Sequence, residues 1–278
     1  MRVQMKIRIG HSPDPDDAFM FYALNRKELT MPGFSFEHVI EDIQTLNERA
    51  INTELEITAI SAHAFAYVAS KYYLMRSGAS MGFNYGPVVV SRKKISKDEL
   101  CSKEIAIPGK LTTAGLLLKL AIGEYSARVI PFDKIMAAVQ AGEVQAGLVI
   151  HEGQITHPSF GLRKVIDLGE WWHDETGGLP VPLGLDVVRK DLGKSLATKL
   201  SKLLKNSIET GFNNKEDAVT YAMQYSRGTD RVTTEKFIRM YVNRLTDDLR
   251  TEGVQALEKL YEMSFVKGLL PRVHLEFV

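Results

Sequence analysis

Residues 6–17 read KIRIGHSPDPDD, a short apolar strand that runs into a turn rich in proline and aspartate. The pattern predicts a strand over 6–10, and apolar residues at helical spacing predict a helix from about 16 to 29. Residues 104–122, EIAIPGKLTTAGLLLKLAI, repeat this order of strand, turn and helix. Recurring units of this kind predict an α/β fold with largely parallel strands.

The same pattern extends along the rest of the chain. Further strands are expected at 34–40, 56–60, 88–90, 104–107, 128–131, 145–150 and 181–188. Helices are expected at 62–72, 112–122 and 133–141, and another begins after Asp42. From residue 194 onward the pattern is helical only, which indicates that roughly the last 90 residues wrap one lobe. We expect Asn214 and Asp217 to cap a helix over 216–226, and Gly268 to end the last helix.

The charged stretch 92–103 marks a change in composition and predicts a crossover between two lobes. The strand at 181–188 is placed to return the chain to the first lobe. We therefore expect residues 1–90 and 188–278 to form lobe one and residues 91–187 to form lobe two. Two chain crossings make a hinge, which predicts that the lobes close over a ligand.

Composition excludes several classes of protein. The 278 residues are 45% hydrophobic and 25% charged, as in an ordinary globular protein, and 35 basic residues against 34 acidic ones argue against a nucleic-acid partner. Cys101 is the one cysteine, so neither an internal disulfide nor a cysteine-rich metal site is expected. No apolar run approaches the length of a membrane span and the N-terminus lacks the apolar core of a secretory signal, so we expect a cytoplasmic location.

Three strand-to-helix turns place small polar groups beyond the carboxyl ends of strands, where ligands bind in open α/β sheets. The first spans residues 12–17 and is either a capped turn or part of a site. In the second, Ser61 lies at a helix start, where the ordinary role is an N-cap. In the third, residues 108–114, the free N–H groups of a helix N-terminus and the hydroxyls of Thr112 and Thr113 favour a carboxylate.

The apolar strand 145–150 ends in His151, which is followed by Glu152. An imidazole at the end of a buried strand can accept a proton near neutral pH, although a core histidine with a satisfied partner is the more frequent outcome. The pair does not fit a His-Glu-x-x-His zinc motif because residue 155 is isoleucine. The sequence also lacks a glycine-rich nucleotide motif, so we expect neither a metal nor a cofactor.

Ordered matches along nearly the whole chain carry a family resemblance. They include SPxPxDxF at 12–19, EDIQTLN at 41–47, GPVVV at 86–90, GEVQAGL at 142–148 and DLGEWW at 167–172. The sequence resembles the 1,4-dihydroxy-6-naphthoate synthases of the futalosine route to menaquinone. The resemblance implies a two-lobed fold like that of type II periplasmic binding proteins, with the ligand cleft between the lobes.

The resemblance also implies an activity, that of a cofactor-independent carbon–carbon lyase. Such an enzyme converts cyclic dehypoxanthine futalosine, a small aromatic carboxylate substrate, to 1,4-dihydroxy-6-naphthoate. His151 matches the histidine proposed as the family's general base. The matched motifs further imply that the substrate-binding residues are Asp17, Ser61, Thr112, Thr113 and Ala114.

The chain departs from the family pattern at its first turn. The family commonly has cysteine, asparagine and threonine where this chain has Asp14, Asp16 and Ala18. Extra carboxylates would repel an anionic substrate unless they are paired or point away, so a divergent substrate stays open.

Two other functions also remain open. A chorismate dehydratase of the same pathway has a similar fold but opens with a Tyr-Leu-Asn turn, and a solute-binding protein for a small carboxylate would share the fold without the chemistry.

Overall fold

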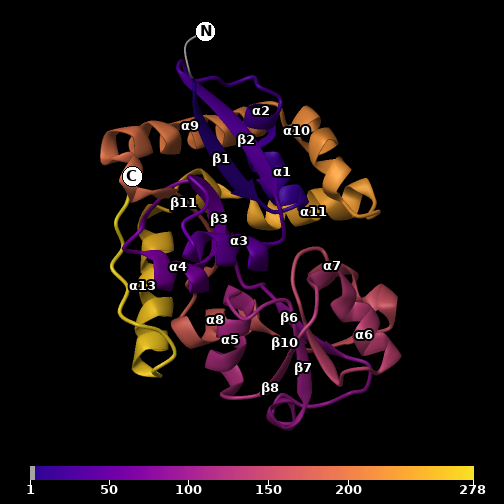
Figure 1. Ribbon diagram of the computed structural model, residues 1–278. Helices are drawn as coiled ribbons and strands as arrows, with labels where there is room; N and C mark the ends of the chain where they lie inside the picture. The colour runs from indigo at the N-terminus through magenta and orange to yellow at the C-terminus, as the bar shows by residue number, and fades with distance from the viewer. Residues whose placement is uncertain (1–3) are drawn as a thin grey trace.

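The computed structural model describes residues 4–278, which form two lobes, each built on its own sheet (Figure 1). The first sheet has the order β2-β1-β3-β11-β4, with β5 paired to β11. Its strands are β1 (Met5–His11), β2 (Phe34–Ile40), β3 (Ile57–Ser61), β4 (Tyr72–Leu74), β5 (Ser80–Gly82) and β11 (Val181–Arg189). The second sheet has the order β10-β6-β9-β7-β8. Its strands are β6 (Val88–Ser91), β7 (Glu104–Ile107), β8 (Ser126–Val129), β9 (Ala146–Val149) and β10 (Arg163–Asp167).

The two-lobed organisation agrees with the sequence analysis, but both chain crossings come earlier than expected. β6 pairs with β9 and β10, so residues 88–91 already belong to the second lobe. β11 pairs with β3, β4 and β5, so the chain is back in the first lobe from Val181 rather than from residue 188. The charged stretch 92–103 is thus a loop within the second lobe and not the crossover.

The prediction of largely parallel strands holds for only part of each sheet. β1 is parallel to β2 and β3, and β7 is parallel to β8 and β9. β11 runs antiparallel to β3, and β6 runs antiparallel to β9. A parallel pair needs a crossover connection, usually a helix, whereas β6 and β11 enter their sheets directly from the other lobe.

Helices cover both sheets. The first lobe contains α1 (Pro15–Met20), α2 (Tyr22–Asn25), α3 (Ile43–Ile51), α4 (Ala62–Val68), α9 (Lys194–Asn213), α10 (Lys215–Ala222), α11 (Arg231–Tyr241), α12 (Arg244–Asp247) and α13 (Arg250–Val266). The second contains α5 (Thr113–Ile122), α6 (Ile135–Ala141), α7 (Gly153–Thr156) and α8 (Leu168–Thr176). In Figure 1 the C-terminal helices α9 to α11 lie around the first lobe, as expected for a helical end that wraps one lobe.

Two helix boundaries confirm the sequence signals, and a third contradicts them. Asp42 accepts hydrogen bonds from the N–H groups of Gln44 and Thr45 and so caps α3. Gly268, with a φ of +69°, follows the last turn of α13. The capping expected at Asn214 is wrong, because its side chain makes no capping hydrogen bond. α9 runs up to Asn213 and the N–H of Asn214 still bonds back to Thr210, so this residue joins two helices directly.

One hydrophobic core is shared by the two lobes. It joins side chains of α4 and α13 in the first lobe, such as Phe65 and Tyr261, to Leu117 of α5 and Leu148 of β9 in the second. Each lobe also has a core of its own, centred on α1 and α9 in the first and on α6 in the second. The lobes are therefore packed against each other and not merely tethered.

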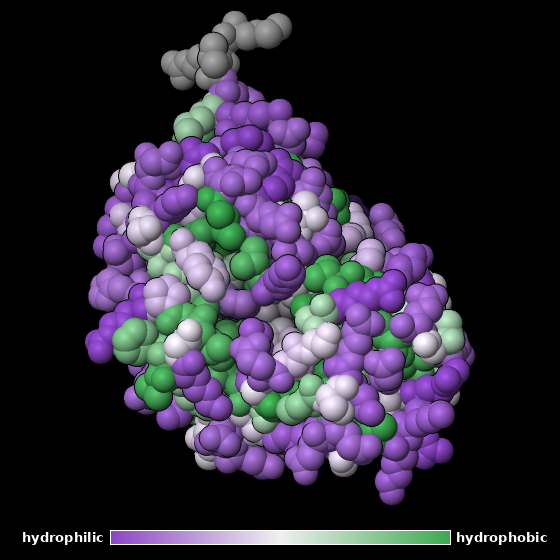
Figure 2. Space-filling model, turned by 60° about the horizontal axis from the view of Figure 1, so that its bottom comes forward, coloured by the Kyte–Doolittle hydropathy of each residue, from purple (hydrophilic) through white to green (hydrophobic). Residues whose placement is uncertain are grey.

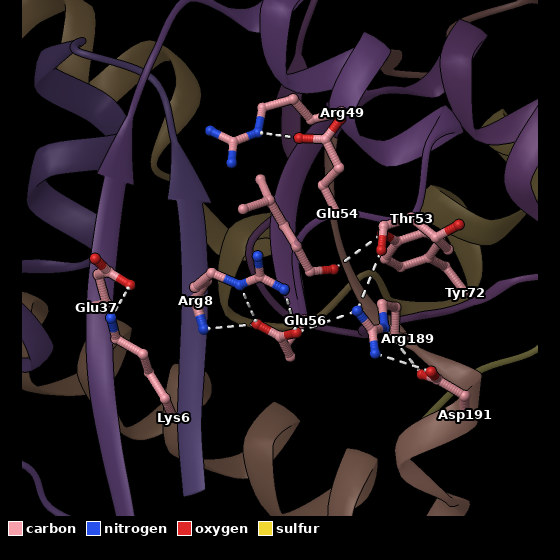
Figure 3. A network of polar contacts seen from close by, with 11 residues as sticks. Lys6, Arg8, Glu37, Arg49, Thr53, Glu54, Glu56, Tyr72, Arg189 and Asp191 are labelled. Atoms are coloured by element: carbon pink, nitrogen blue, oxygen red, sulfur yellow. Dashed lines mark hydrogen bonds and ion pairs between the residues drawn. The ribbon is translucent and has the colours of Figure 1, made fainter.

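A polar network joins three strands of the first sheet at the edge shown in Figure 3. Glu56 lies just before β3 and is almost fully buried. Its carboxylate accepts hydrogen bonds from Arg8 of β1 at 2.8 and 2.9 Å and from Arg189 of β11 at 3.1 Å. Charged hydrogen bonds thus link β1, β3 and β11.

The outer surface is mixed in character. On the face that Figure 2 shows, hydrophobic residues form scattered patches among hydrophilic ones. Among residues 4–278, no helix combines the length and the apolar composition needed to cross a membrane.

Candidate active site

A cavity lies where the two lobes meet, and every residue proposed from the sequence as a site residue lines it. These residues are Asp17, Ser61, Thr112, Thr113, Ala114 and His151. The cavity volume is about 100 Å³, which is smaller than the roughly 300–1,000 Å³ of typical small-molecule sites. Ser61 belongs to the first lobe and the turn at Thr112 to the second, so the cavity brings together groups from both sides of the cleft.

Strand ends position these groups. β3 ends at Ser61, β7 leads into the turn before α5, and β9 ends two residues before His151. Asp17, in the first turn of α1, follows β1 in the same way. Because parallel strands of a sheet end at the same edge, each lobe presents its turns to the cleft.

Ser61 precedes α4 but does not cap it, since its side chain makes no capping hydrogen bond. Instead, Asn47 donates from Nδ2 to the Ser61 Oγ at 3.0 Å and accepts at Oδ1 from the Ser61 N–H at 2.8 Å. The hydroxyl of Ser61 therefore keeps its own proton to donate into the cavity.

The hydroxyls of Thr112 and Thr113 are engaged within the protein, which differs from the expectation that they bind a ligand directly. Thr112 caps α5 by accepting from the Gly115 N–H, and it donates to the Gly109 carbonyl at 2.9 Å. Thr113 Oγ1 donates to the Leu183 carbonyl at 2.6 Å. The groups left to a ligand are the first-turn N–H groups of Thr113 and Ala114, which have no partner inside the helix.

His151 is held in an unusual backbone conformation, with a φ of +53°. Its Nδ1 lies 3.2 Å from Asp14 Oδ2. The rings of Phe132 and Phe237 face it edge-on, with centroids at 4.9 and 6.4 Å. Nε2 is buried and has no hydrogen-bond partner within residues 4–278, although the side chain lines the cavity.

The surroundings keep His151 neutral. Burial lowers the pKa of its imidazole and so does the positive charge of Arg227, while Asp14 opposes both. The net direction is downward, so the imidazole is unprotonated near neutral pH and can accept a proton.

The three carboxyl groups of the segment 12–17 do not all carry charge. Asp14 is fully buried and is paired with Arg227, whose Nη2 lies 2.6 Å from Oδ1. Burial and the neighbouring carboxylates raise the pKa of Asp16 well above its ordinary value, and burial with Asp186 nearby raises that of Asp17 to about 8. The turn that looked repulsive to an anion is thus one paired carboxylate and two carboxyl groups that favour the protonated form.

Neither Asp16 nor Asp17 caps α1, which begins at Pro15 without a side-chain capping hydrogen bond. Asp17 Oδ2 instead accepts from the Ser12 N–H at 2.6 Å. Asp16 Oδ1 is buried beside the cavity without a partner in the described chain.

A family model described as menaquinone biosynthesis matches residues 7–265. The chain belongs to this family. It is 36% identical over 263 residues to a 1,4-dihydroxy-6-naphthoate synthase of Thermus thermophilus, covering 95% of both chains. The match extends over nearly the whole chain and is not confined to one motif.

Two solved structures resemble this chain closely in shape. The crystal structure of protein AF1704 from Archaeoglobus fulgidus has a TM-score of 0.91 at 48% identity, covering 95% of this chain and 98% of that one. The alkanesulfonate-binding protein SsuA of Xanthomonas axonopodis has a TM-score of 0.71 at 13% identity, covering 96% and 95%. The second similarity concerns the fold alone, and it confirms the expected architecture of a periplasmic binding protein.

Sequence reasoning missed the part of the site that this member of the menaquinone biosynthesis family draws from its C-terminal helices. Arg227 reaches from the loop before α11 to Asp14 and to Glu152 of the second lobe. Tyr241 of α11 donates to Gln154 Oε1 at 2.5 Å, and Phe237 lies one turn earlier on the same cavity wall.

No local signal marks Arg227, because its partners are far away in the chain. Phe237 and Tyr241 show a signal of a general kind, since their four-residue spacing puts them on one helix face. The cavity itself is needed to show that this face belongs to the site.

The described residues give no ready metal site. Within residues 4–278, no three or more His, Cys, Asp or Glu side chains are grouped in a way that could hold a metal ion. The groups that line the cavity include carboxyl groups, hydrogen-bond donors and the His151 imidazole.

Proposed function

We propose that this protein is a 1,4-dihydroxy-6-naphthoate synthase, a lyase that breaks a carbon–carbon bond of cyclic dehypoxanthine futalosine with His151 as general base and without a cofactor. Its family membership and its relative in Thermus thermophilus support this activity.

The single observation that carries the proposal is the state of His151. A largely buried, neutral imidazole whose Nε2 has no partner in the described chain and lies on the cavity wall is a ready proton acceptor. A histidine that served only the core would have both nitrogens satisfied or packed away from the cavity.

Other groups that line the cavity suit an anionic or hydroxylated substrate. The first-turn N–H groups of α5 lie at the positive end of a helix dipole and favour a carboxylate. Ser61 adds a hydroxyl that Asn47 holds in place. Anchored in this way, the substrate would have its reacting part near Nε2, and bond cleavage can begin with removal of a proton from a C–H or O–H group.

The assay is direct. Purified protein is incubated with cyclic dehypoxanthine futalosine, and the naphthoate product is followed by absorbance and mass. We expect steady formation of 1,4-dihydroxy-6-naphthoate that slows by about 10²–10⁴-fold in His151→Asn. Asp98→Asn, which changes an exposed carboxylate on the loop 92–103, is the control. Absence of product with folded wild-type protein would refute the proposal.

The same experiment separates the two alternatives. Chorismate consumed in place of the futalosine derivative would identify a chorismate dehydratase. Tight binding of a small carboxylate without turnover would identify a solute-binding protein, for which the structural similarity to SsuA shows the fold and nothing more. A cytoplasmic location goes with the biosynthetic role and is part of the proposal; recovery in a periplasmic fraction would count against it.

A further inference from the structure

Asp14 and His151 meet across the two lobes. Asp14 immediately precedes α1 of the first lobe, whereas His151 follows β9 of the second. Asp14 Oδ2 lies 3.2 Å from His151 Nδ1. The contact that fixes one side of the imidazole therefore exists only while the lobes are together.

Asp14 is itself held from two further directions. Ser12 donates from its hydroxyl to Oδ2 at 2.5 Å, and Arg227 lies 2.6 Å from Oδ1. Although burial works in the opposite direction, the charge of Arg227 and the hydrogen bond from Ser12 hold the pKa of Asp14 below its ordinary value. Asp14 is a carboxylate, and a carboxylate can only accept hydrogen bonds.

Arg227 is likewise held in place by several contacts besides the one with Asp14. It donates from Nη1 to the Pro13 carbonyl at 2.7 Å and pairs with both Asp14 and Glu152. Its guanidinium also lies over the ring of Phe132, 4.9 Å from the centroid. Arg227 belongs to the first lobe and Glu152 and Phe132 to the second, so this side chain joins the lobes beside the imidazole.

These contacts favour one arrangement of protons on His151. Since Asp14 only accepts, its contact with Nδ1 favours a hydrogen on that nitrogen, and in the neutral ring Nε2 then carries the lone pair. Nε2 is the nitrogen left without a partner beside the cavity.

We propose that Asp14, held by Arg227, is a positioning residue that fixes His151 in the Nδ1–H tautomer with its Nε2 lone pair directed at the substrate. The catalytic consequence rests on the proposed function, but the tautomer does not.

The charges around the ring define the expected pH behaviour. Asp14 and Asp42 favour the protonated imidazole, and Arg227 disfavours it. Glu152, next in the chain, is paired with Arg227 and burial raises its pKa to about 7. Loss of the Asp14 charge alone should therefore lower the pKa of His151 further.

The first test needs neither substrate nor a variant of Asp14. Long-range ¹H–¹⁵N spectra of the wild-type protein near pH 7.5 report which nitrogen of each histidine carries a proton. The His151 signal is recognised by its absence in His151→Asn among the 7 histidines of the chain. We expect a protonated Nδ1 and an unprotonated Nε2, and the opposite tautomer would overturn the proposal.

The second test is kinetic and uses Asp14→Asn. We expect kcat to fall at least about tenfold, and by no more than the roughly 10²–10⁴-fold that a general base contributes, with KM little changed. The acid limb of the kcat/KM profile should move to lower pH. In the His151→Asn background, Asp14→Asn should cost nothing further, because the two residues act as one unit.

The outcomes keep the two proposals apart. If Asp14→Asn leaves the acid limb unmoved, Asp14 has only a structural role. The same conclusion follows if Asp14→Asn lowers the rate as much in the His151→Asn background as in the wild type. Inactive wild-type protein with the expected Nδ1–H tautomer would refute the proposed function and leave the positioning role standing. Asp98→Asn is the matched control, since it removes an exposed carboxylate far along the chain and should leave both the limb and the spectrum unchanged.

Discussion

At the scale of single residues, the backbone of His151 limits which substitutions are informative. A φ of +53° lies in the left-handed region, where asparagine is tolerated and β-branched residues are strained. His151→Asn should therefore keep the fold while removing the base, and turnover should fall by about 10²–10⁴-fold. Steady-state kinetics at saturating substrate measures this loss, and calorimetry of ligand binding checks that affinity is kept. Wild-type turnover in the variant would remove His151 from the mechanism.

Asp186 predicts a pH dependence of stability. It is buried in β11 with no hydrogen-bond partner for either carboxyl oxygen in the described chain, and burial raises its pKa well above the ordinary value. The folded state thus binds a proton that the unfolded state has released above about pH 4, so stability falls as the pH rises.

The substitution Asp186→Asn should remove this dependence. We expect the variant to gain free energy of unfolding over the wild type between pH 5 and 8, by at most about 1.4 kcal/mol per pH unit. Urea unfolding at several pH values measures the difference, with Asp98→Asn as an exposed control. Parallel curves for wild type and Asp186→Asn would contradict the prediction.

Sequence reasoning works at this scale where a residue's position in a local unit carries the information. Ser61, the turn at Thr112 and His151 were recognised because each follows a buried strand, and the resemblance added their roles. Arg227 could not be recognised, since its value depends on Asp14 and Glu152, which lie far from it in the chain and meet it only in the folded molecule. The capping role weighed for Ser61 failed because a distant side chain, Asn47, binds it instead.

At the scale of elements, Glu56 is the clearest stabilising contact between strands. Burial alone would raise the pKa of Glu56. The hydrogen bonds from Arg8 and the charge of Arg189 outweigh this effect and hold the pKa below its ordinary value. Glu56→Gln should lower the free energy of unfolding by about 2 kcal/mol at pH 7, because two guanidinium groups lose a charged acceptor.

The sign of the pH effect follows from the lowered pKa. The contribution of Glu56 is present above about pH 4.3, its unfolded value, and is lost as the pH falls through the folded value. In urea unfolding, the free energies of unfolding of wild type and variant should therefore differ strongly at pH 7 and only slightly near pH 3. Glu37→Gln is the matched control, since its pair with Lys6 is exposed at the same sheet (Figure 3) and is worth at most about 1 kcal/mol.

Element types were more predictable than their directions. Strand and helix periodicity predicted β2 and β7 to the residue, because each is flanked by clear turn signals. The antiparallel placement of β6 and β11 depends on which lobe the chain arrives from, and no local pattern contains that information. β4 and β5 were missed because each has only 3 residues, too few to show a period.

At the scale of the whole molecule, the shared core predicts that the lobes unfold together. Trp171 and Trp172 both lie on α8 of the second lobe, so their fluorescence reports that lobe. Helical circular dichroism is dominated by the long helices of the first, α9 and α13. We expect the two signals to follow one coincident transition in urea. Separate midpoints would show that the lobes are independent.

Leu117→Ala tests the same core from one side. Leu117 is fully buried on α5 within the cluster that joins both lobes. Its truncation should cost about 2–5 kcal/mol and shift both signals by the same amount. Val232→Ala, at a side chain that is 76% exposed, should stay within about 0.5 kcal/mol of the wild type.

The order of the strands along the chain also has a consequence during synthesis on the ribosome. β6 to β10 form one sheet from a continuous stretch of chain, so all its strands can pair as soon as this stretch has emerged. The other sheet lacks its central strand until β11 is made, and until then β3 presents an open edge to solvent. Nascent chains arrested before Val181 should therefore be the species that chaperones bind, and translation speed just before β11 should influence yield more than translation speed anywhere in the finished second lobe.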